Sequence, residues 1–132
     1  MYKRQRYGLE VGYAFQIADD LLDYAAGVDQ TGKARGQDLR EGKVTLPLLC
    51  AMEAEPALRD EVRELLRGGP PVDDLALRRT LDKVQAGPGP AAARELALAH
   101  SQKAIDALAG LPEGQAKSAL VALAEFVVGR RS

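Results

Sequence analysis

The sequence predicts an all-α protein, a helical bundle in a single domain over residues 1–132, on three observations. Apolar residues recur at spacings of three and four, as in Tyr13, Ile17, Leu21 and Tyr24, which is the period of an amphipathic helix. No stretch alternates apolar and polar residues as a half-buried strand does. Clusters of glycine and proline, such as residues 68–71, divide the chain into helical stretches.

The helices predicted in chain order span residues 3–25, 47–54, 56–66, 72–85, 91–109 and 115–129. A glycine-rich loop separates the first from the second, and Pro47 suits the first helical turn, where a missing N–H costs nothing. Asp73 and Asp74 lie at the N-terminal end of the fourth helix, which favours a capping role over a second acidic site. The last two helices are joined by only a few residues, so we expect them to be antiparallel neighbours.

Bulk composition describes an ordinary globular protein and excludes several classes. The 132 residues carry a net charge of −1, and their basic residues are dispersed, which argues against nucleic-acid binding. No apolar run reaches the ~18 residues that a membrane span needs, and no signal-peptide pattern opens the chain, so we expect a cytoplasmic protein. Cys50 is the single cysteine; its apolar surroundings favour a buried structural thiol over a reactive one. His100, the only histidine, has no partner for a zinc site.

The segment from Phe15 to Tyr24 carries three carboxylates near the end of the first predicted helix, those of Asp19, Asp20 and Asp23. No lysine or arginine lies near them in the sequence, and the helix dipole disfavours anions at a C-terminus by about 0.3–1 kcal/mol each. Carboxylates placed at such a cost suit a cation, and hard oxygens suit Mg²⁺ shared with substrate phosphates. The alternative is that these residues form the solvated face of a surface helix.

A basic loop follows the acidic run. Residues 31–47 contain the basic side chains of Lys33, Arg35, Arg40 and Lys43. Glycines at 32, 36 and 42 allow tight turns and close approach of the backbone. An acidic helix end followed by a flexible basic loop is the pairing that a diphosphate–Mg²⁺ ligand needs, since carboxylates bind the metal and ammonium groups neutralise the remaining oxygens.

The order of these motifs resembles the second aspartate-rich region of the trans-isoprenyl diphosphate synthases, or polyprenyl synthetases. Residues 6–47 contain F-Q, D-D-x-x-D, G-K-x-x-G-x-D and E-G-K-x-T-x-P in sequence, and residues 91–131 resemble the family's last two helices. The resemblance implies the C-terminal half of an isoprenoid-synthase-type fold. Family members are usually about twice as long, and their first aspartate-rich motif is not found here. We therefore expect a divided synthase or a fragment, active only with a partner that carries the first motif.

The resemblance also implies roles for individual residues. Asp19, with Asp23 beside it, would ligate Mg²⁺ while Asp20 orients water or a ligand. Lys33 would contact the allylic diphosphate, and Lys43 would support the same charge. Gln16, preceded by Phe15, would face the reacting end of the pocket. The expected catalytic residues are Asp19, Lys33 and Gln16, and the expected substrate-binding residues are Phe15, Gln16, Lys33 and Lys43.

The activity implied by the resemblance is condensation of an allylic diphosphate with isopentenyl diphosphate. The first alternative is a non-catalytic regulatory or scaffold subunit of a heteromeric synthase. The second is an unrelated helical protein with a chance metal motif. The three carboxylates and two lysines favour the enzyme, because a scaffold has no physical need of an acidic face at a helix end. Product length and allylic substrate are not encoded in the motifs present.

Overall fold

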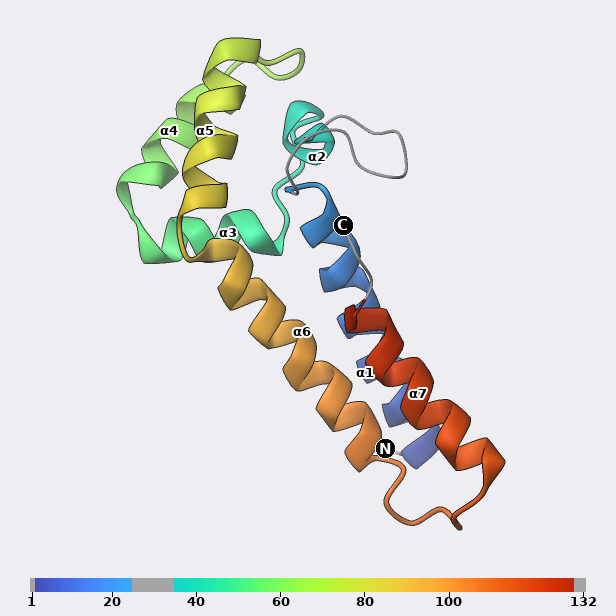
Figure 1. Ribbon diagram of the computed structural model, residues 1–132. Coiled ribbons are helices and arrows are strands. Elements are labelled where there is room, and N and C mark those ends of the chain that lie inside the picture. Colours follow the sequence, from blue (N-terminus) through green and yellow to red (C-terminus); the bar gives the residue numbers. More distant parts are fainter. Residues whose placement is uncertain (1, 25–34, 130–132) are drawn as a thin grey trace. The chain divides into compact units, whose positions relative to one another are not determined.

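A computed structural model describes residues 2–24 and 35–129 of the chain, and these residues confirm the all-α prediction. No strand occurs among them (Figure 1). The helices are α1 (Lys3–Leu22), α2 (Gln37–Arg40), α3 (Leu46–Ala54), α4 (Ala57–Leu66), α5 (Asp74–Ala86), α6 (Gly89–Asp106) and α7 (Gln115–Gly129). Lys33 and Gly32 lie outside the described residues.

Most predicted helices are present, with small differences at their ends. Helix α3 has a proline in its first turn, as expected for Pro47. The predicted cap of α5 is confirmed, because the Asp73 carboxylate accepts a hydrogen bond of 2.9 Å from the Ala76 N–H. Helix α1 ends at Leu22, earlier than predicted, and a turn follows in which the Tyr24 N–H donates to the Leu21 carbonyl. Helix α2 lies inside the segment predicted to be a loop.

The described residues divide into two compact units, and the single domain predicted for residues 1–132 stays a prediction. Unit 1 contains α1 as far as Asp19 together with residues 94–129 of α6 and α7. Small side chains line its interior, and Ala14, Ala97, Ala104 and Ala124 are fully buried. Small residues let helices approach closely, and the alanine-rich sequence of α6 supplies several of them. Ser101 on α6 donates a 2.8 Å hydrogen bond to the Ala124 carbonyl on α7.

Unit 2 contains the described part of residues 20–93, with α2, α3, α4 and α5. Its core is built mainly from leucines, which fill the interior without polar atoms: Leu39, Leu48, Leu58, Leu77 and Leu81, joined by Val62, Val84 and Tyr24. Gly89 allows the first turn of α6 to approach α3, because a Cβ there would lie 2.7 Å from the Ala51 Cβ. Helix α5, which Asp73 caps, contributes Leu77, Leu81 and Val84 to this core.

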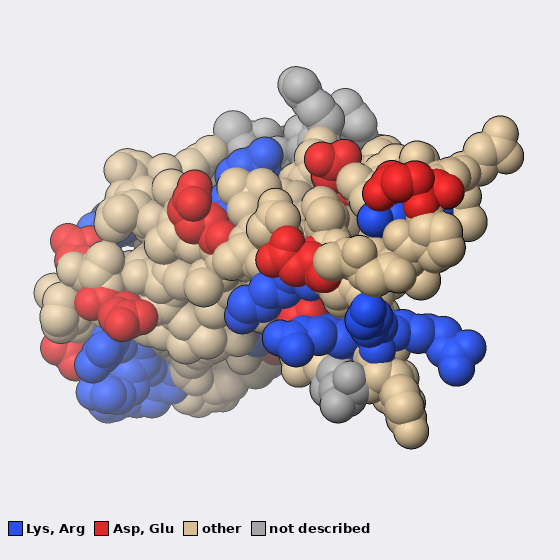
Figure 2. Space-filling view, turned by 90° about the horizontal axis from the view of Figure 1, so that it is seen from below, with Lys and Arg blue, Asp and Glu red and all other residues tan. Residues whose placement is uncertain are grey.

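Surface features bear on the classes of protein that composition argued against, namely membrane-spanning and nucleic-acid-binding proteins. None of the described helices combines the length and apolarity needed to cross a membrane. Acidic and basic side chains both occur over the face drawn in Figure 2, and neither sign covers it alone. The Cys50 thiol is half-buried rather than fully buried, which corrects the sequence-based expectation. Partial burial raises the pKa of this thiol, and the Glu53 carboxylate adds to the rise, so the group remains a weak nucleophile at neutral pH.

Candidate diphosphate and metal site

The acidic run occupies the end of α1. Asp19 and Asp20 lie in the last turn of the helix, and Asp23 lies in the turn that follows it. Asp19 is exposed, whereas Asp20 and Asp23 are half-buried. Carboxylate oxygens are donors that Mg²⁺ prefers, so the chemistry of these residues fits that metal. Among residues 2–24 and 35–129, no three acidic, histidine or cysteine side chains form a metal-binding group, so the three carboxylates of the acidic run do not by themselves converge on one metal position.

The carboxylate of Asp23 holds the chain segment that returns to α1. Its Oδ2 accepts a hydrogen bond of 3.0 Å from the Asp38 N–H in the first turn of α2. The carbonyl of Asp23 accepts a second bond, of 2.8 Å, from the Gly36 N–H. The Asp38 carbonyl in turn accepts a 2.7 Å bond from the Lys43 N–H. Hydrogen bonds in series therefore connect the acidic run to the segment that carries Lys43.

Two glycines give this segment its shape, as the sequence predicted for a tightly turning loop. Gly36 has φ of 80° and Gly42 has φ of 86°, values in the left-handed region that glycine adopts without a steric cost. Gly36 is also buried against the core, since a Cβ at that position would lie 2.4 Å from Leu81 Cδ1. Leu39, on α2, is fully buried. The segment is thus anchored both by hydrogen bonds and by apolar packing.

A buried pair of hydroxyl groups adjoins this segment. The Tyr24 hydroxyl and the Thr45 hydroxyl are both buried, and neither makes a hydrogen bond of ordinary geometry with a described residue. Burial raises the pKa of the Tyr24 phenol, and the carboxylates of Asp23 and Asp38 raise it further. The phenol therefore stays protonated and adds no charge beside the acidic run. Neither hydroxyl was predicted to matter, although the T of E-G-K-x-T-x-P marks Thr45 in the sequence.

The basic residues of the predicted loop divide into two kinds. Arg35 pairs with Asp82 at 2.9 Å and Arg40 pairs with Asp74 at 3.0 Å, so both guanidinium groups tie the segment to α5. Neither arginine is among the residues expected to bind the diphosphate, and these ion pairs give both a structural role. Lys43 is different, because its side chain is 65% exposed and its Nζ lies 3.8 Å from a Glu41 carboxylate oxygen. An exposed ammonium on a fixed backbone is suited to binding an anion.

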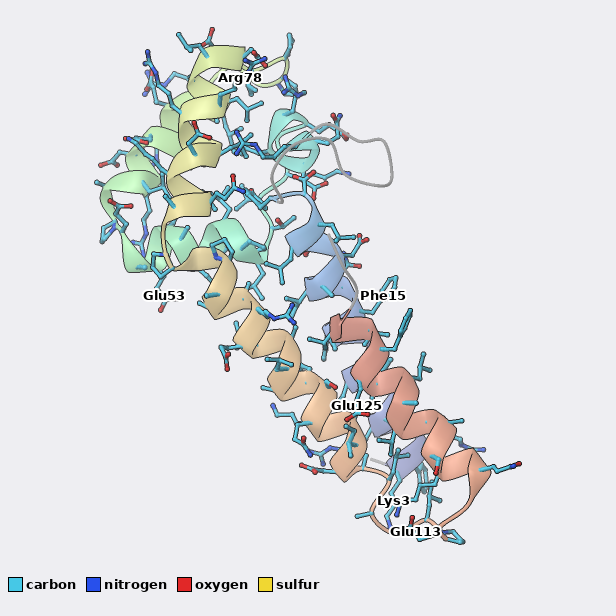
Figure 3. All side chains as sticks on the ribbon, in the orientation of Figure 1. Lys3, Phe15, Glu53, Arg78, Glu113 and Glu125 are labelled. Carbon is cyan, nitrogen blue, oxygen red and sulfur yellow. The ribbon has the colours of Figure 1, made fainter. Side chains whose placement is uncertain are left out.

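Phe15 and Gln16 lie on α1 and are both exposed, and their predicted position facing a pocket stays a prediction. The Phe15 side chain is 45% exposed and points from α1 away from α6 (Figure 3). By contrast, Tyr7 and Ile17 on the same helix are buried in unit 1. Helix α1 thus packs one face within its unit and presents another face, with large apolar side chains, at the surface.

Sequence reasoning missed a partly buried polar contact in unit 1. His100 Nδ1 lies 2.6 Å from Glu10 Oε2, and the Glu10 side chain is only 11% exposed. The Tyr13 ring lies against the imidazole, with centroids 5.1 Å apart. The sequence signal that could have revealed this contact is Glu10, which shares the helical spacing of the buried residues Tyr7, Ala14 and Ile17. A buried carboxylate requires a partner, and the only histidine of the chain supplies it.

Comparison with known proteins gives a consistent result for the sequence. The sequence profile of the family described as Polyprenyl synthetase matches residues 2–83, which include the acidic run and Lys43. The nonaprenyl diphosphate synthase of Mycobacterium tuberculosis is 40% identical over 125 residues, or 95% of this chain and 37% of that protein. The octaprenyl diphosphate synthase of Escherichia coli is 40% identical over 127 residues, or 96% of this chain and 39% of that protein.

Solved structures agree with the sequence relatives. A polyprenyl synthase from Caulobacter crescentus, complexed with calcium and isoprenyl diphosphate, superimposes with a TM-score of 0.84 at 35% identity, over 98% of this chain and 40% of that one. A heptaprenyl diphosphate synthase from Staphylococcus aureus gives a TM-score of 0.89 at 27% identity, with the same coverage. The chain thus spans about two-fifths of the length of the proteins it matches. Because the match includes more than half of its residues, the chain belongs to the polyprenyl synthetase family.

Proposed function

We propose that this chain supplies the second Mg²⁺–diphosphate binding motif of a trans-prenyltransferase that joins an allylic diphosphate to isopentenyl diphosphate. The observation that carries the proposal is the family match over residues 2–83, within which the carboxylates at the end of α1 and the Lys43 segment are linked by the hydrogen bonds of Asp23 and Asp38. The relatives bear prenyl diphosphate synthase names, and one structural neighbour was solved with a divalent cation and an isoprenyl diphosphate.

The reaction breaks the allylic C–O bond, releasing pyrophosphate and leaving an allylic cation. The double bond of isopentenyl diphosphate attacks that cation, and loss of a proton yields a chain five carbons longer. Mg²⁺ supplies Lewis-acid neutralisation of the charge that develops on the pyrophosphate oxygens. The proposed ligand set is Asp19, Asp20 and Asp23, with Asp19 in direct contact and Asp20 orienting water. Lys43 and Lys33 bind the diphosphate oxygens, while Phe15 and Gln16 adjoin the reacting carbons.

The complete enzyme requires a protein part that carries the first aspartate-rich motif, as a separate subunit or as further chain. Two features support this requirement. The relatives are more than twice the length that this chain covers. Unit 1 also leaves large apolar side chains exposed on its helices, among them Leu9 and Tyr13 on α1 and Phe126 on α7, the last 66% exposed. Exposed apolar surface of this kind favours association with further helices.

The second candidate is a regulatory or scaffold subunit that keeps the helices without taking part in the chemistry. The exposed apolar side chains suit a scaffold equally well. The carboxylates at the end of α1 favour the enzyme, because docking of helices gives no reason to collect three anions where the helix dipole opposes them. The two candidates therefore differ in whether Asp19 matters to turnover.

The test is prenyl transfer by the chain combined with a protein carrying the first motif. Mixed with allylic and isopentenyl diphosphates, the combination is expected to form product only with Mg²⁺ present. Asp19→Ala is expected to lower kcat by about 100-fold or more, which corresponds to at least ~2.7 kcal/mol of lost transition-state stabilisation. The matched control is Asp60→Ala, because Asp60 is an exposed aspartate on α4 in a surface ion pair with Arg63.

Three results would contradict the proposal. Full turnover by the 132-residue chain alone would remove the need for a partner. Full turnover by the partner alone would favour the scaffold. A loss in Asp19→Ala no greater than in Asp60→Ala, with both variants folded, would show that the acidic run is a solvated helix face.

A further inference from the structure

We propose that Asp23 is a positioning residue, which fixes the backbone of the Lys43 segment through Asp38 so that only the lysine side chain has to be ordered when a diphosphate binds. The inference rests on the proposed function and refines it. The resemblance to the family assigns Asp23 to the metal, whereas the hydrogen bonds of this chain give its carboxylate a second task.

The first step is the contact between Asp23 and α2. Asp23 Oδ2 accepts from the Asp38 N–H at 3.0 Å, across fifteen residues of sequence. The same residue accepts from the Gly36 N–H with its carbonyl, at 2.8 Å. A carboxylate that accepts from a backbone N–H makes a charge-assisted bond, which is stronger than a bond between neutral groups. Asp23 therefore holds the returning segment at two points, one of which depends on its side chain.

The second step leads from α2 to Lys43. The Asp38 carbonyl accepts from the Lys43 N–H at 2.7 Å, and the Leu39 carbonyl accepts from the Gly42 N–H at 2.9 Å. Because Leu39 is fully buried, the turn cannot slide along the core without losing apolar contacts. The Lys43 backbone is therefore fixed by the residue whose own N–H is bound to Asp23. The ammonium group, in contrast, is largely exposed, with a Glu41 carboxylate oxygen 3.8 Å from it.

The third step concerns the energetic value of such a connection. A lysine side chain has several rotatable bonds, and an unsettled backbone would add further conformations that must be lost when the ligand binds. Misplacement of a catalytic group by about 1 Å can cost about 100-fold in rate. Fixing the backbone in advance avoids that cost. This role requires only a hydrogen-bond acceptor at position 23, whereas ligation of Mg²⁺ is much weakened when an anionic carboxylate is replaced by a neutral amide oxygen.

That difference gives the test, which compares isosteric and truncating substitutions at two aspartates. In the assembled enzyme, Asp23→Asn keeps an oxygen that can accept from the Asp38 N–H, whereas Asp23→Ala keeps none. We expect kcat/KM of Asp23→Asn to exceed that of Asp23→Ala by at least about tenfold, as part of the ~100-fold cost of misplacement. The matched pair is Asp19→Asn and Asp19→Ala, which should fall equally because both remove a metal ligand.

A double-mutant cycle tests whether Asp23 acts through the lysine. Lys43→Ala should lower kcat/KM in the parent and in Asp23→Asn by similar factors, and should add little to Asp23→Ala. A merely structural role would give multiplicative effects. Equal losses in Asp23→Asn and Asp23→Ala, or multiplicative effects with Lys43→Ala, would overturn the proposal in favour of metal ligation.

Amide hydrogen exchange provides a measurement that needs neither metal nor activity. In the metal-free chain, Asp23→Ala should accelerate exchange of the Asp38 and Lys43 amides, whereas Asp23→Asn and Asp19→Ala should leave both protected. Unchanged protection in Asp23→Ala would refute the contact on which the inference rests. If the assembly shows no prenyl transfer at all, the proposed function fails, and the exchange rates still decide whether Asp23 positions the segment.

Discussion

Replacing Gly36 by alanine tests how tightly the core fixes the segment between the acidic run and Lys43. Gly36 has φ of +80°, and an added Cβ would lie 2.4 Å from Leu81 Cδ1 and 2.9 Å from Leu81 Cδ2. Real contacts of a Cβ essentially never come so close. Leu81 cannot easily swing aside, because its side chain is only 2% exposed within the core of unit 2. Either the leucine or the segment must therefore move.

Two energetic costs of Gly36→Ala add together, one from the backbone conformation and one from the crowding of Leu81. A non-glycine residue in the left-handed region costs roughly 1–2 kcal/mol, and overpacking a core costs about 1–3 kcal/mol. We expect Gly36→Ala to lower the free energy of unfolding by roughly 2–5 kcal/mol, a large share of the ~5–15 kcal/mol typical of a domain. Gly68→Ala separates the terms, since Gly68 has φ of +88° and nothing lies within 4 Å of its added Cβ. It should lose only about 1–2 kcal/mol.

Urea denaturation followed by circular dichroism measures both variants against the parent. The midpoint should fall clearly further for Gly36→Ala than for Gly68→Ala, with similar slopes. Leu81→Ala alone should cost about 2–5 kcal/mol, and the double variant should lose less than the sum of the two single losses, because it removes the clash. Equal losses for the two glycine variants would show that the segment yields freely at Gly36, and would refute the reasoning about its anchoring.

Two further predictions concern polar contacts that the helical pattern does not contain. His100→Ala leaves the Glu10 carboxylate, which is 11% exposed, without its partner, so we expect the free energy of unfolding to fall by about 1–3 kcal/mol. Thermal melting checks this, with His100→Gln as the control because its amide can donate a hydrogen bond. An unchanged melting temperature in His100→Ala would contradict the prediction. The hydrogen bond from Arg40 lowers the pKa of Asp74 below its ordinary 3.8. The contact therefore stabilises the folded chain at pH values above the pKa that Asp74 has in the unfolded chain, and this stabilisation disappears as the pH falls through the lower pKa of Asp74 in the folded chain. Denaturation midpoints should therefore differ between parent and Asp74→Asn at neutral pH and converge below about pH 4, and a constant difference would disprove the assignment.

The sequence by itself determined the local structure of this chain. The helix over 115–129, the proline in the first turn of α3 and the Asp73 cap follow from a few adjacent residues, because helical period, proline geometry and capping are local properties. The position of the acidic run at the end of a helix follows from the same pattern. The family resemblance added to this the expectation of a metal and a diphosphate and the roles of individual residues. One of those residues, Lys33, lies outside the described structure.

Only the tertiary structure decided which side chains meet. Asp23 binds an N–H fifteen residues away, and His100 meets Glu10 across ninety residues, distances over which spacing in the sequence carries no information. The basic loop illustrates the consequence. Arg35 and Arg40 have the same sequence character as Lys43, yet packing against α5 gives both arginines carboxylate partners and leaves the lysine exposed. Charge pattern alone could not separate them, because an ion pair depends on the neighbours that folding brings within a few ångströms.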